Sequence, residues 1–306
     1  MTAPRSGSIL TTYRRHKELL LLLLPSMVLL VLFNYVPMVG LVLAFKDYMA
    51  SLGMVRSPWV GLENFQRLFA SEDFPRALRN TATISLLRLT FGFVAPIVLA
   101  LMLNEVRVSW FKRGVQTLTY LPYFLSWVIL GGMFLMLLGS EGPVNWLVQA
   151  AGHSPVSFLS NGAWFIVTII LTGIWQSAGY GAVIYLAALA GIDPNLYEAA
   201  AIDGAGRWKQ TRHVTLPCLA PTIVVLLILS LSNILNAGFD QIYNMFNPMV
   251  YDVGDIIDTY VLRRMVYQDF GLATAAGLFK SVIGLLLVVS ANGAARRLSG
   301  GEHGIW

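Results

Sequence analysis

Two basic residues lie inside long apolar segments, where a charged side chain is costly. Arg88 belongs to an apolar segment at 82–103, and Lys280 belongs to another at 273–295. A charge among apolar groups persists when it pairs with an opposite charge, reaches water or lines a hydrated cavity. We therefore expect each cation either to pair within the protein, with Asp240 as the best candidate, or to line a basic cavity that binds an anion.

Two further apolar segments carry groups that could bind a sugar through hydrogen bonds and ring stacking. In a continuous helix, Asn233, Asn236 and Asp240 would share one face, because they are spaced i, i+3 and i, i+4. The segment at 164–190 adds aromatic and amide side chains. Hydrogen bonding between helices is the alternative role for all of these groups. The complete set of candidate pathway residues is Arg88, Trp175, Gln176, Tyr180, Asn233, Asn236, Asp240 and Lys280.

Residues suited to metal binding or catalysis are sparse. The four histidines include no i, i+4 pair, and Cys218 is the single cysteine, so neither a metal site nor an intrachain disulfide is predicted. A membrane enzyme would be expected to pair carboxylates near one interface, and the closest group is Asp252, Asp255 and Asp258. A polar loop explains these acids more simply, so we predict no catalytic residue.

The composition indicates what kind of scaffold positions these groups. The chain has 306 residues, of which 56% are hydrophobic and 12% are charged. A soluble domain carries about 25% charged residues, so a soluble enzyme, a disordered chain and a coiled coil are excluded. The net charge of +5 fits basic residues at a cytoplasmic membrane face rather than nucleic-acid binding. We predict an all-α protein that crosses a bilayer several times.

Six apolar segments are long enough to cross a membrane as helices, which takes about 20 residues each. They lie at 19–45, 82–103, 115–138, 164–190, 218–237 and 273–295. The second helix is expected to begin near Phe74, outside the bilayer, because Asp73 and Pro75 are typical of a helix start. The first segment is too long for a cleavable signal and is predicted to remain as a helix.

The distribution of Lys and Arg predicts the orientation, because these residues concentrate in short cytoplasmic segments. One side of the six segments is richer in them. Its basic residues are Arg5, Arg14, Arg15, Lys17, Arg107, Lys112, Arg113, Arg207, Lys209, Arg212, Arg296 and Arg297. The opposite side has fewer, and most of those lie in one long loop that also contains acidic residues. Both termini are therefore predicted to be cytoplasmic.

The loop between the fourth and fifth segments has the signals of a short cytoplasmic helix. Asp193 and Pro194 fit the N-cap and N1 positions, and an Ala-rich stretch follows them. Gly204 or Gly206 can end the helix. The small side chains would let a partner backbone approach closely, and Glu198 could meet a basic group on that partner. An ordinary amphipathic connector is the alternative interpretation.

The full pattern of this loop, 191–217, resembles the coupling-loop signature of ATP-binding-cassette importer permeases. The signature reads Glu-Ala-Ala, three residues, Gly, nine residues, an aliphatic residue, one residue and Leu-Pro. Val214 stands where the pattern often has Ile, and the place of the loop between the fourth and fifth of six segments matches the carbohydrate branch. The residues that the resemblance assigns to ATPase coupling are Glu198, Ala199, Ala200, Asp203, Gly204, Leu216 and Pro217.

Further segments resemble the permeases for oligosaccharides and polysaccharide fragments, so the resemblance covers nearly the whole chain. These segments are 45–48, 59–65, 238–242, 247–252 and 258–261. The resemblance implies a type I importer permease in a bacterial cell membrane, with six helices and both termini inside. It also implies four kinds of partner: a second homologous permease subunit, two ATP-binding-cassette ATPase subunits, an extracytoplasmic solute-binding protein and an oligosaccharide.

The energy source is expected on another chain. The sequence has no Gly-x-x-x-x-Gly-Lys-Ser/Thr motif, and its cytoplasmic loops are too short to hold an ATPase domain. ATP and Mg²⁺ would therefore bind to the partner ATPase, and no cofactor is predicted on this chain.

The predicted organisation has three parts. Residues 1–79 form the cytoplasmic N-terminus, the first helix and an outer loop, residues 80–295 form the permease domain, and residues 296–306 form a cytoplasmic tail. The predicted function is that of a membrane-spanning subunit of an ATP-driven, binding-protein-dependent oligosaccharide importer. Free cations at Arg88 and Lys280 would favour acidic, uronate-containing saccharides. The alternatives are a neutral sugar or other small solute, a carrier that works alone with ions, and an integral membrane enzyme.

Overall fold

The computed structural model describes residues 17–298 and is built of helices. Within these residues the only β pairing is an isolated bridge between Lys46 and Trp59. Six helical stretches are long and apolar enough to cross a membrane. Helices suit this environment because they satisfy the backbone hydrogen bonds internally. The prediction of an all-α protein with six crossing segments is confirmed.

The first two crossing stretches are longer than the apolar segments that predicted them. The first comprises α2 (Lys17–Leu30), the π-helical η1 (Val31–Tyr35) and the 3₁₀-helical η2 (Val36–Phe45). The second comprises α5 (Asp73–Leu87), the π-helical η3 (Arg88–Gly92) and α6 (Phe93–Glu105). The short helices α3 (Gly53–Arg56) and α4 (Glu63–Ala70) lie between them. The second stretch begins beside Phe74 as predicted, but Glu72 rather than Asp73 occupies the N-cap.

The third apolar segment is not one helix, contrary to the prediction for 115–138. It divides into α7 (Ser109–Tyr120), the 3₁₀ turn η4 (Leu121–Phe124) and α8 (Trp127–Leu138). Pro122 lies in the turn, and a proline cannot donate the backbone hydrogen bond that a continuous helix needs. The Ser126 side chain then caps α8 by accepting from the Ile129 N–H. The short α9 (Pro143–Ala150) follows α8, and together these two form the third candidate crossing stretch, Trp127–Ala150.

The fourth crossing stretch is a single long helix, α10 (Gly162–Ala190). The Asn161 side chain caps its start by accepting from the N–H groups of Ala163 and Trp164. Gly179 lets α10 lie against α7, because a Cβ at that position would collide with the backbone of Thr119. The cytoplasmic loop then forms α11 (Pro194–Ile202), α12 (Arg207–Gln210) and the π-helical η5 (Thr211–Thr215).

The fifth apolar segment is also broken, whereas a helix through residue 237 was predicted. The main helix, α13 (Leu216–Ser232), ends before the 3₁₀ turn η6 (Ile234–Asn236) and the short α14 (Phe239–Met245). Ala237 and Gly238 both have positive φ, 45° and 77°, and this left-handed backbone cannot continue a right-handed helix. The outer side continues through η7 (Pro248–Val250), α15 (Tyr251–Gly254) and α16 (Ile257–Val266). The sixth crossing helix is α17 (Phe270–Leu298).

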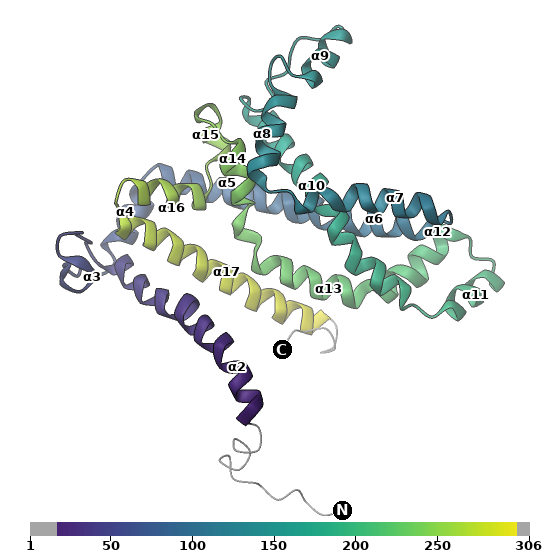
Figure 1. Cartoon of the computed structure of the whole chain (residues 1–306), viewed down its shortest axis with the longest axis horizontal. Coiled ribbons are helices and arrows are strands. Elements are labelled where there is room, and N and C mark those ends of the chain that lie inside the picture. The colour runs from purple at the N-terminus through teal and green to yellow at the C-terminus, as the bar shows by residue number, and fades with distance from the viewer. Residues whose placement is uncertain (1–16, 299–306) are drawn as a thin grey trace, which may run out of the picture.

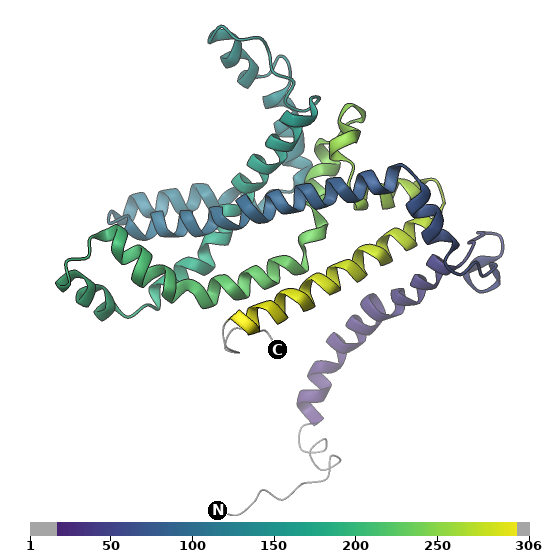
Figure 2. The same cartoon turned by 180° about the vertical axis from the view of Figure 1, so that it is seen from behind.

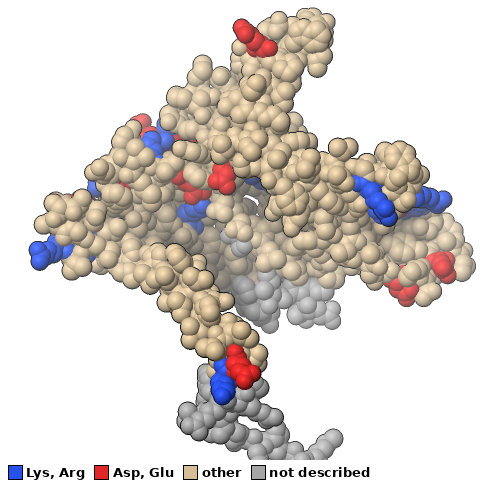
Figure 3. All heavy atoms as spheres, in the orientation of Figure 1, with Lys and Arg blue, Asp and Glu red and all other residues tan. Residues whose placement is uncertain are grey.

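Most of the connecting helices lie at two opposite ends of the bundle, whereas α9 projects from it beyond α8 (Figure 1). Figure 1 and Figure 2 show α3, α4 and α16 at one end and α11 and α12 at the other. Helix α17 packs along α13 and α16, and α10 packs along α6 and α7. On the face drawn in Figure 3, most charged side chains lie toward the extremities of the molecule, with large uncharged areas between them. A smaller charged group lies near the centre, where that face is hollowed.

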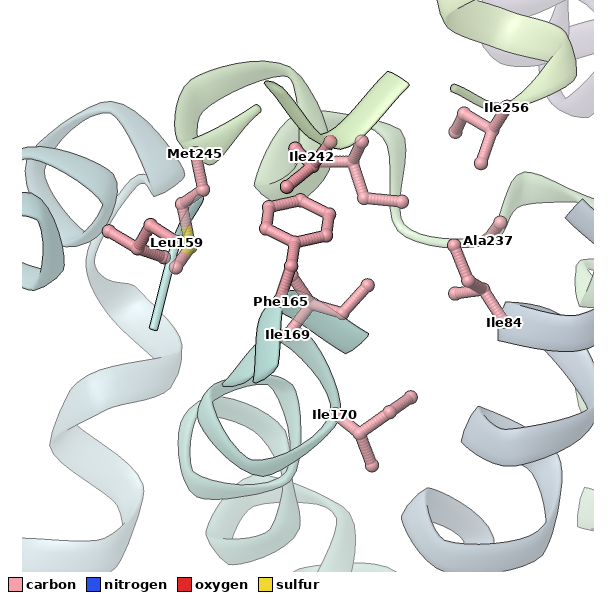
Figure 4. Packing of buried hydrophobic residues seen from close by; sticks show 10 residues of the cluster. Ile84, Leu159, Phe165, Ile169, Ile170, Ala237, Ile242, Met245 and Ile256 are labelled. Carbon is pink, nitrogen blue, oxygen red and sulfur yellow. The ribbon is translucent and has the colours of Figure 1, made fainter. Parts of the chain in front are cut away.

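A buried apolar cluster holds α10 against the outer end of the fifth segment. Phe165 and Ile169 of α10 point toward Ile242 of α14 in Figure 4, and Ile84 approaches from α5. Lipid tails are as apolar as these side chains, so the contacts stabilise the bundle mainly through close packing. This cluster fixes the position of α14, which follows the break in the fifth helix.

Candidate transport pathway and coupling loop

The cytoplasmic loop forms the short helix that its sequence predicts. The Asp193 carboxylate accepts a hydrogen bond from the Asn195 N–H at 3.0 Å, and Pro194 is the first residue of α11. The helix ends before Gly204, whose φ of 73° is the left-handed conformation of a C-terminal cap. The Ala205 N–H then bonds back to the Ala200 carbonyl oxygen at 2.9 Å.

Side-chain contacts attach this loop to two membrane helices. The Tyr197 hydroxyl lies 3.0 Å from the Thr215 hydroxyl, just before α13 begins at Leu216. Arg207 forms a 2.6 Å ion pair with Glu105, the last residue of α6. Tyr197 therefore joins α11 to the start of the fifth crossing stretch, and Arg207 joins the following helix α12 to the end of the second.

The surface of the loop presents the predicted coupling residues together with large apolar groups. Glu198, Ala199, Asp203 and Pro217 are exposed, and Ala200 and Leu216 are half-buried. Ile202 and Trp208 are among the most exposed apolar side chains of the described residues, at 86% and 76%. Trp208 also fits the coupling-loop signature, whereas Ile202 was not predicted as a contact, although an apolar side chain in a polar loop was an available signal.

The break in the fifth segment overturns the predicted common face of its polar residues. Asn233 ends α13, Asn236 ends η6 and Asp240 lies in the first turn of α14. The prediction assumed an unbroken helix, and the left-handed pair Ala237–Gly238 redirects the chain between the second and third of these residues. Asn233 and Asn236 still meet, with 3.4 Å between the donating amide nitrogen of Asn236 and the accepting oxygen of Asn233.

Lys280 is paired within the protein, but not with Asp240 as predicted. Its ammonium group donates to both carboxylate oxygens of Asp258 at 2.7 Å and to the Asn236 amide oxygen at 2.8 Å. Asp258 comes from α16 on the outer side. Sequence spacing could not indicate this pair, because α16 folds back onto α17 through a tertiary contact.

Arg88 is bound to a neutral partner, which also differs from the predicted pairing with Asp240. Its guanidinium donates to the side-chain oxygen of Gln241. The Gln241 amide nitrogen donates to the Ile169 carbonyl oxygen at 2.8 Å and to the Thr172 hydroxyl at 2.7 Å. Gln241 is fully buried and was missed by the sequence analysis. A buried amide on a short outer helix gives no local sequence signal.

The candidate side chains of α10 contact η4 and α8. Tyr180 stacks on Tyr123 with ring centroids 4.0 Å apart, and Trp175 packs edge-on against Phe134. Gln176 donates to the Tyr123 carbonyl oxygen at 3.4 Å. Of the three candidates from α10, Tyr180 alone borders a cavity described below.

Two cavities meet at the break in the fifth segment. The first, of about 540 Å³, is the Arg88 cavity; its lining includes Ser85, Arg88, Tyr180, Asn233 and Asn236. The second, of about 570 Å³, is the Lys280 cavity; its lining includes Asn236, Asp240, Gln241, Asp258 and Lys280. Both have the size of a small-molecule site. The structure thus brings together six of the eight predicted pathway residues around this break, and leaves Trp175 and Gln176 outside both cavities.

The outer end of the bundle carries a separate ionic cluster that the sequence analysis did not identify. Asp255 is fully buried and accepts two hydrogen bonds from Arg263, at 2.7 and 3.1 Å. These bonds raise the pKa of the Arg263 guanidinium above its ordinary value. Arg76 lies 4.0 Å from the same carboxylate and bonds to Asp73 at 2.7 Å. The cluster therefore joins the start of α5 to α16.

The described residues contain a polar break lined by two cavities and an exposed short helix at the predicted coupling loop. Between residues 17 and 298, no three His, Cys, Asp or Glu side chains are placed to hold a metal ion. A bundle of six crossing helices, polar cavities within the bundle and an exposed helix anchored to two crossing stretches define a membrane permease driven by another subunit.

Comparison with known proteins identifies the family. Residues 92–300 match the family described as binding-protein-dependent transport system inner membrane component, and the chain belongs to it. The family consists of inner membrane transport components and one relative is named as a transport system permease, which confirms the predicted class of protein and its membrane location.

Relatives of similar length match nearly the whole chain. Protein LplB of Bacillus subtilis is 43% identical over 97% of this chain and 94% of its own. The polygalacturonan/rhamnogalacturonan transport system permease protein YteP of Bacillus subtilis is 45% identical over 95% of this chain and 91% of its own. The solved bacterial alginate ABC transporter, in complex with an alginate pentasaccharide-bound periplasmic protein, contains a chain with a TM-score of 0.90 and 40% identity. That match covers 98% of this chain and 100% of the other.

Proposed function

We propose that this permease imports acidic oligosaccharides built from uronate units. Its relatives of similar length include proteins named for polygalacturonan/rhamnogalacturonan and for alginate. These are acidic polymers with a carboxylate on many of their sugar rings. The observation that carries the proposal is the polar break in the fifth segment, where a cation, amides and hydroxyls line cavities of ligand size.

The proposed transporter is an assembly of several chains. A second homologous permease completes the membrane pathway, and an extracytoplasmic solute-binding protein delivers the saccharide. Two ATPase subunits bind ATP with Mg²⁺, and one of them docks on α11 and α12, where Glu198 and the exposed Ile202 of α11 and Trp208 of α12 offer charge and apolar contact.

A neutral sugar is the alternative substrate. More distant relatives include a trehalose/maltose permease of Thermococcus litoralis and a lactose permease of Rhizobium radiobacter, at 28% and 33% identity. The charge of the transported saccharide therefore distinguishes the proposed substrate from this alternative.

A matched pair of probes tests the substrate. Cells with the complete importer take up either a uronate tetrasaccharide or the same tetrasaccharide with every carboxylate reduced to a hydroxymethyl group. We expect the acidic form to enter at least about tenfold faster, because a charge-assisted contact is worth roughly 1.5–3 kcal/mol. Equal uptake, or faster uptake of the reduced form, contradicts the proposal.

A further inference from the structure

We propose that Arg88, and not Lys280, is the residue that binds a substrate carboxylate within the membrane. This inference rests on the proposed function, since it concerns how an acidic saccharide is recognised. The two cations differ in their charge partners, in their freedom to move and in the cavity that each one lines.

The charge of Lys280 is already neutralised. The ammonium group makes three hydrogen bonds, two of them to the Asp258 carboxylate, and three is its full donor capacity. The side chains of Lys280 and Asp258 are 17% and 25% exposed, so this pair lies in a largely desolvated place. An incoming anion would have to displace Asp258 and leave that carboxylate unpaired, which is unfavourable.

The charge of Arg88 has no such partner. Over residues 17–298, no carboxylate lies within ion-pair distance of its guanidinium, and the partner Gln241 is neutral. The Nε atom is buried and has no hydrogen-bond partner. A cation inside an apolar bundle is costly without an anion. An anionic group bound beside Arg88 would remove that cost.

The guanidinium is held in a fixed place. It lies against Gly238, where the positive φ suits glycine and where a Cβ would collide with the guanidinium atoms. On another side it approaches Gly173 of α10, where a Cβ would lie 3.5 Å from its Nη2 atom. Gln241 cannot rotate its oxygen away, because its amide nitrogen is bound to Ile169 and Thr172. Gln241 is therefore a positioning residue for Arg88.

A held guanidinium facing a cavity is well suited to a carboxylate. The planar fork of an arginine matches the two oxygens of a carboxylate better than an ammonium group does. The Arg88 cavity is also lined by Ser85, Tyr180 and Asn236, which are hydroxyl, aromatic and amide groups of the kind that contact sugar rings. A neutral sugar would occupy the same space and leave Arg88 without an anion.

Two substitutions test the inference from opposite directions. Arg88→Gln removes the cation. Gln241→Glu keeps Arg88 but gives it a carboxylate partner, so the site should be neutralised from within. We expect both to lower the ratio of uronate to carboxyl-reduced tetrasaccharide uptake by about tenfold or more, mainly through slower uptake of the acid.

The matched control removes the other cation together with its partner. Lys280→Gln combined with Asp258→Asn leaves no unpaired charge, and we expect it to preserve the uptake ratio. The solute-binding protein is the same in every variant, so a changed ratio is a property of the permease. Membrane abundance and ATPase activity stimulated by the loaded binding protein show which variants are assembled.

The outcomes separate this inference from the proposed function. If the unaltered importer does not prefer the acid, the proposed function fails, and this inference fails with it. If the preference exists but survives Gln241→Glu and every assembled Arg88→Gln importer, only the assignment to Arg88 fails. A ratio that falls in the Lys280→Gln/Asp258→Asn control and not in the other two also overturns it. Should Arg88→Gln fail to assemble, Gln241→Glu decides, because it retains the arginine.

Discussion

Arg88 and Lys280 have the same charge and lie in comparable apolar segments, yet their surroundings differ. Lys280 has a carboxylate from α16, whereas Arg88 has a buried amide from α14. The sequence indicated that both cations needed partners, because their neighbours along the chain are apolar. It could not identify the partners, since each comes from an outer helix whose position depends on the break at Ala237–Gly238.

The Lys280–Asp258 pair should be strongly coupled energetically. Lys280→Gln or Asp258→Asn alone leaves one charge without its partner in a largely buried place, and each should cost about 2–4 kcal/mol. The double substitution should cost less than the sum of the singles, by about 1–3 kcal/mol. Chemical unfolding of the purified permease in detergent measures the three free-energy changes. If the free-energy changes of the two single substitutions simply add up to that of the double substitution, the pair contributes no interaction energy. The exposed pair Arg207–Glu105 is the control, and we expect it to show weak coupling.

At the scale of the elements, local sequence signals predicted where the coupling helix starts and ends. They did not predict that two of the apolar segments are broken into shorter helices. Asp193, Pro194 and Gly204 act over a few residues, and α11 has the predicted bounds. The third and fifth segments are apolar throughout, so hydropathy favoured unbroken helices. Pro122 was an available signal for the first break and Gly238 for the second, whereas an alanine such as Ala237 has no preference for left-handed backbone.

Two substitutions in the predicted coupling loop test whether α11 transmits ATP hydrolysis to the membrane helices. Glu198→Lys reverses an exposed charge, and Gly204→Leu places a branched side chain at φ 73°, which costs about 1–2 kcal/mol locally. We expect both variants to remain in the membrane and to lose most transport. Co-purification of the ATPase shows whether docking or signalling has failed.

A second glycine provides the control for that substitution. Gly152 has φ 83° and open space where a Cβ would lie, as Gly204 does, but it follows α9 in the loop between the third and fourth segments. Gly152→Leu therefore imposes the same backbone strain away from the coupling loop, and ATPase co-purification should persist. Normal uptake in both Glu198→Lys and Gly204→Leu would show that this loop does not couple ATP hydrolysis to transport.

At the scale of the whole molecule, the composition and the positions of basic residues were sufficient to predict the architecture. Six apolar segments require six crossings, and the short basic loops lie at the end that carries α11 and α12. The substrate is harder to predict from the sequence, because substrate preference depends on which charges remain unpaired after folding. That property of Arg88 is visible only once the outer helices are in place.

The central claim is that this chain forms the membrane pathway of an importer whose energy comes from a separate ATPase. Its most direct test is reconstitution of the permease pair and the ATPase in liposomes, with the solute-binding protein and a labelled uronate tetrasaccharide outside. We expect the saccharide to accumulate inside only when ATP and Mg²⁺ reach the ATPase side. No accumulation is expected when the ATPase subunits or the binding protein are omitted. Accumulation by the permease alone, driven by an ion gradient, would show that the chain is an ion-coupled carrier and not the permease of an ATP-driven importer.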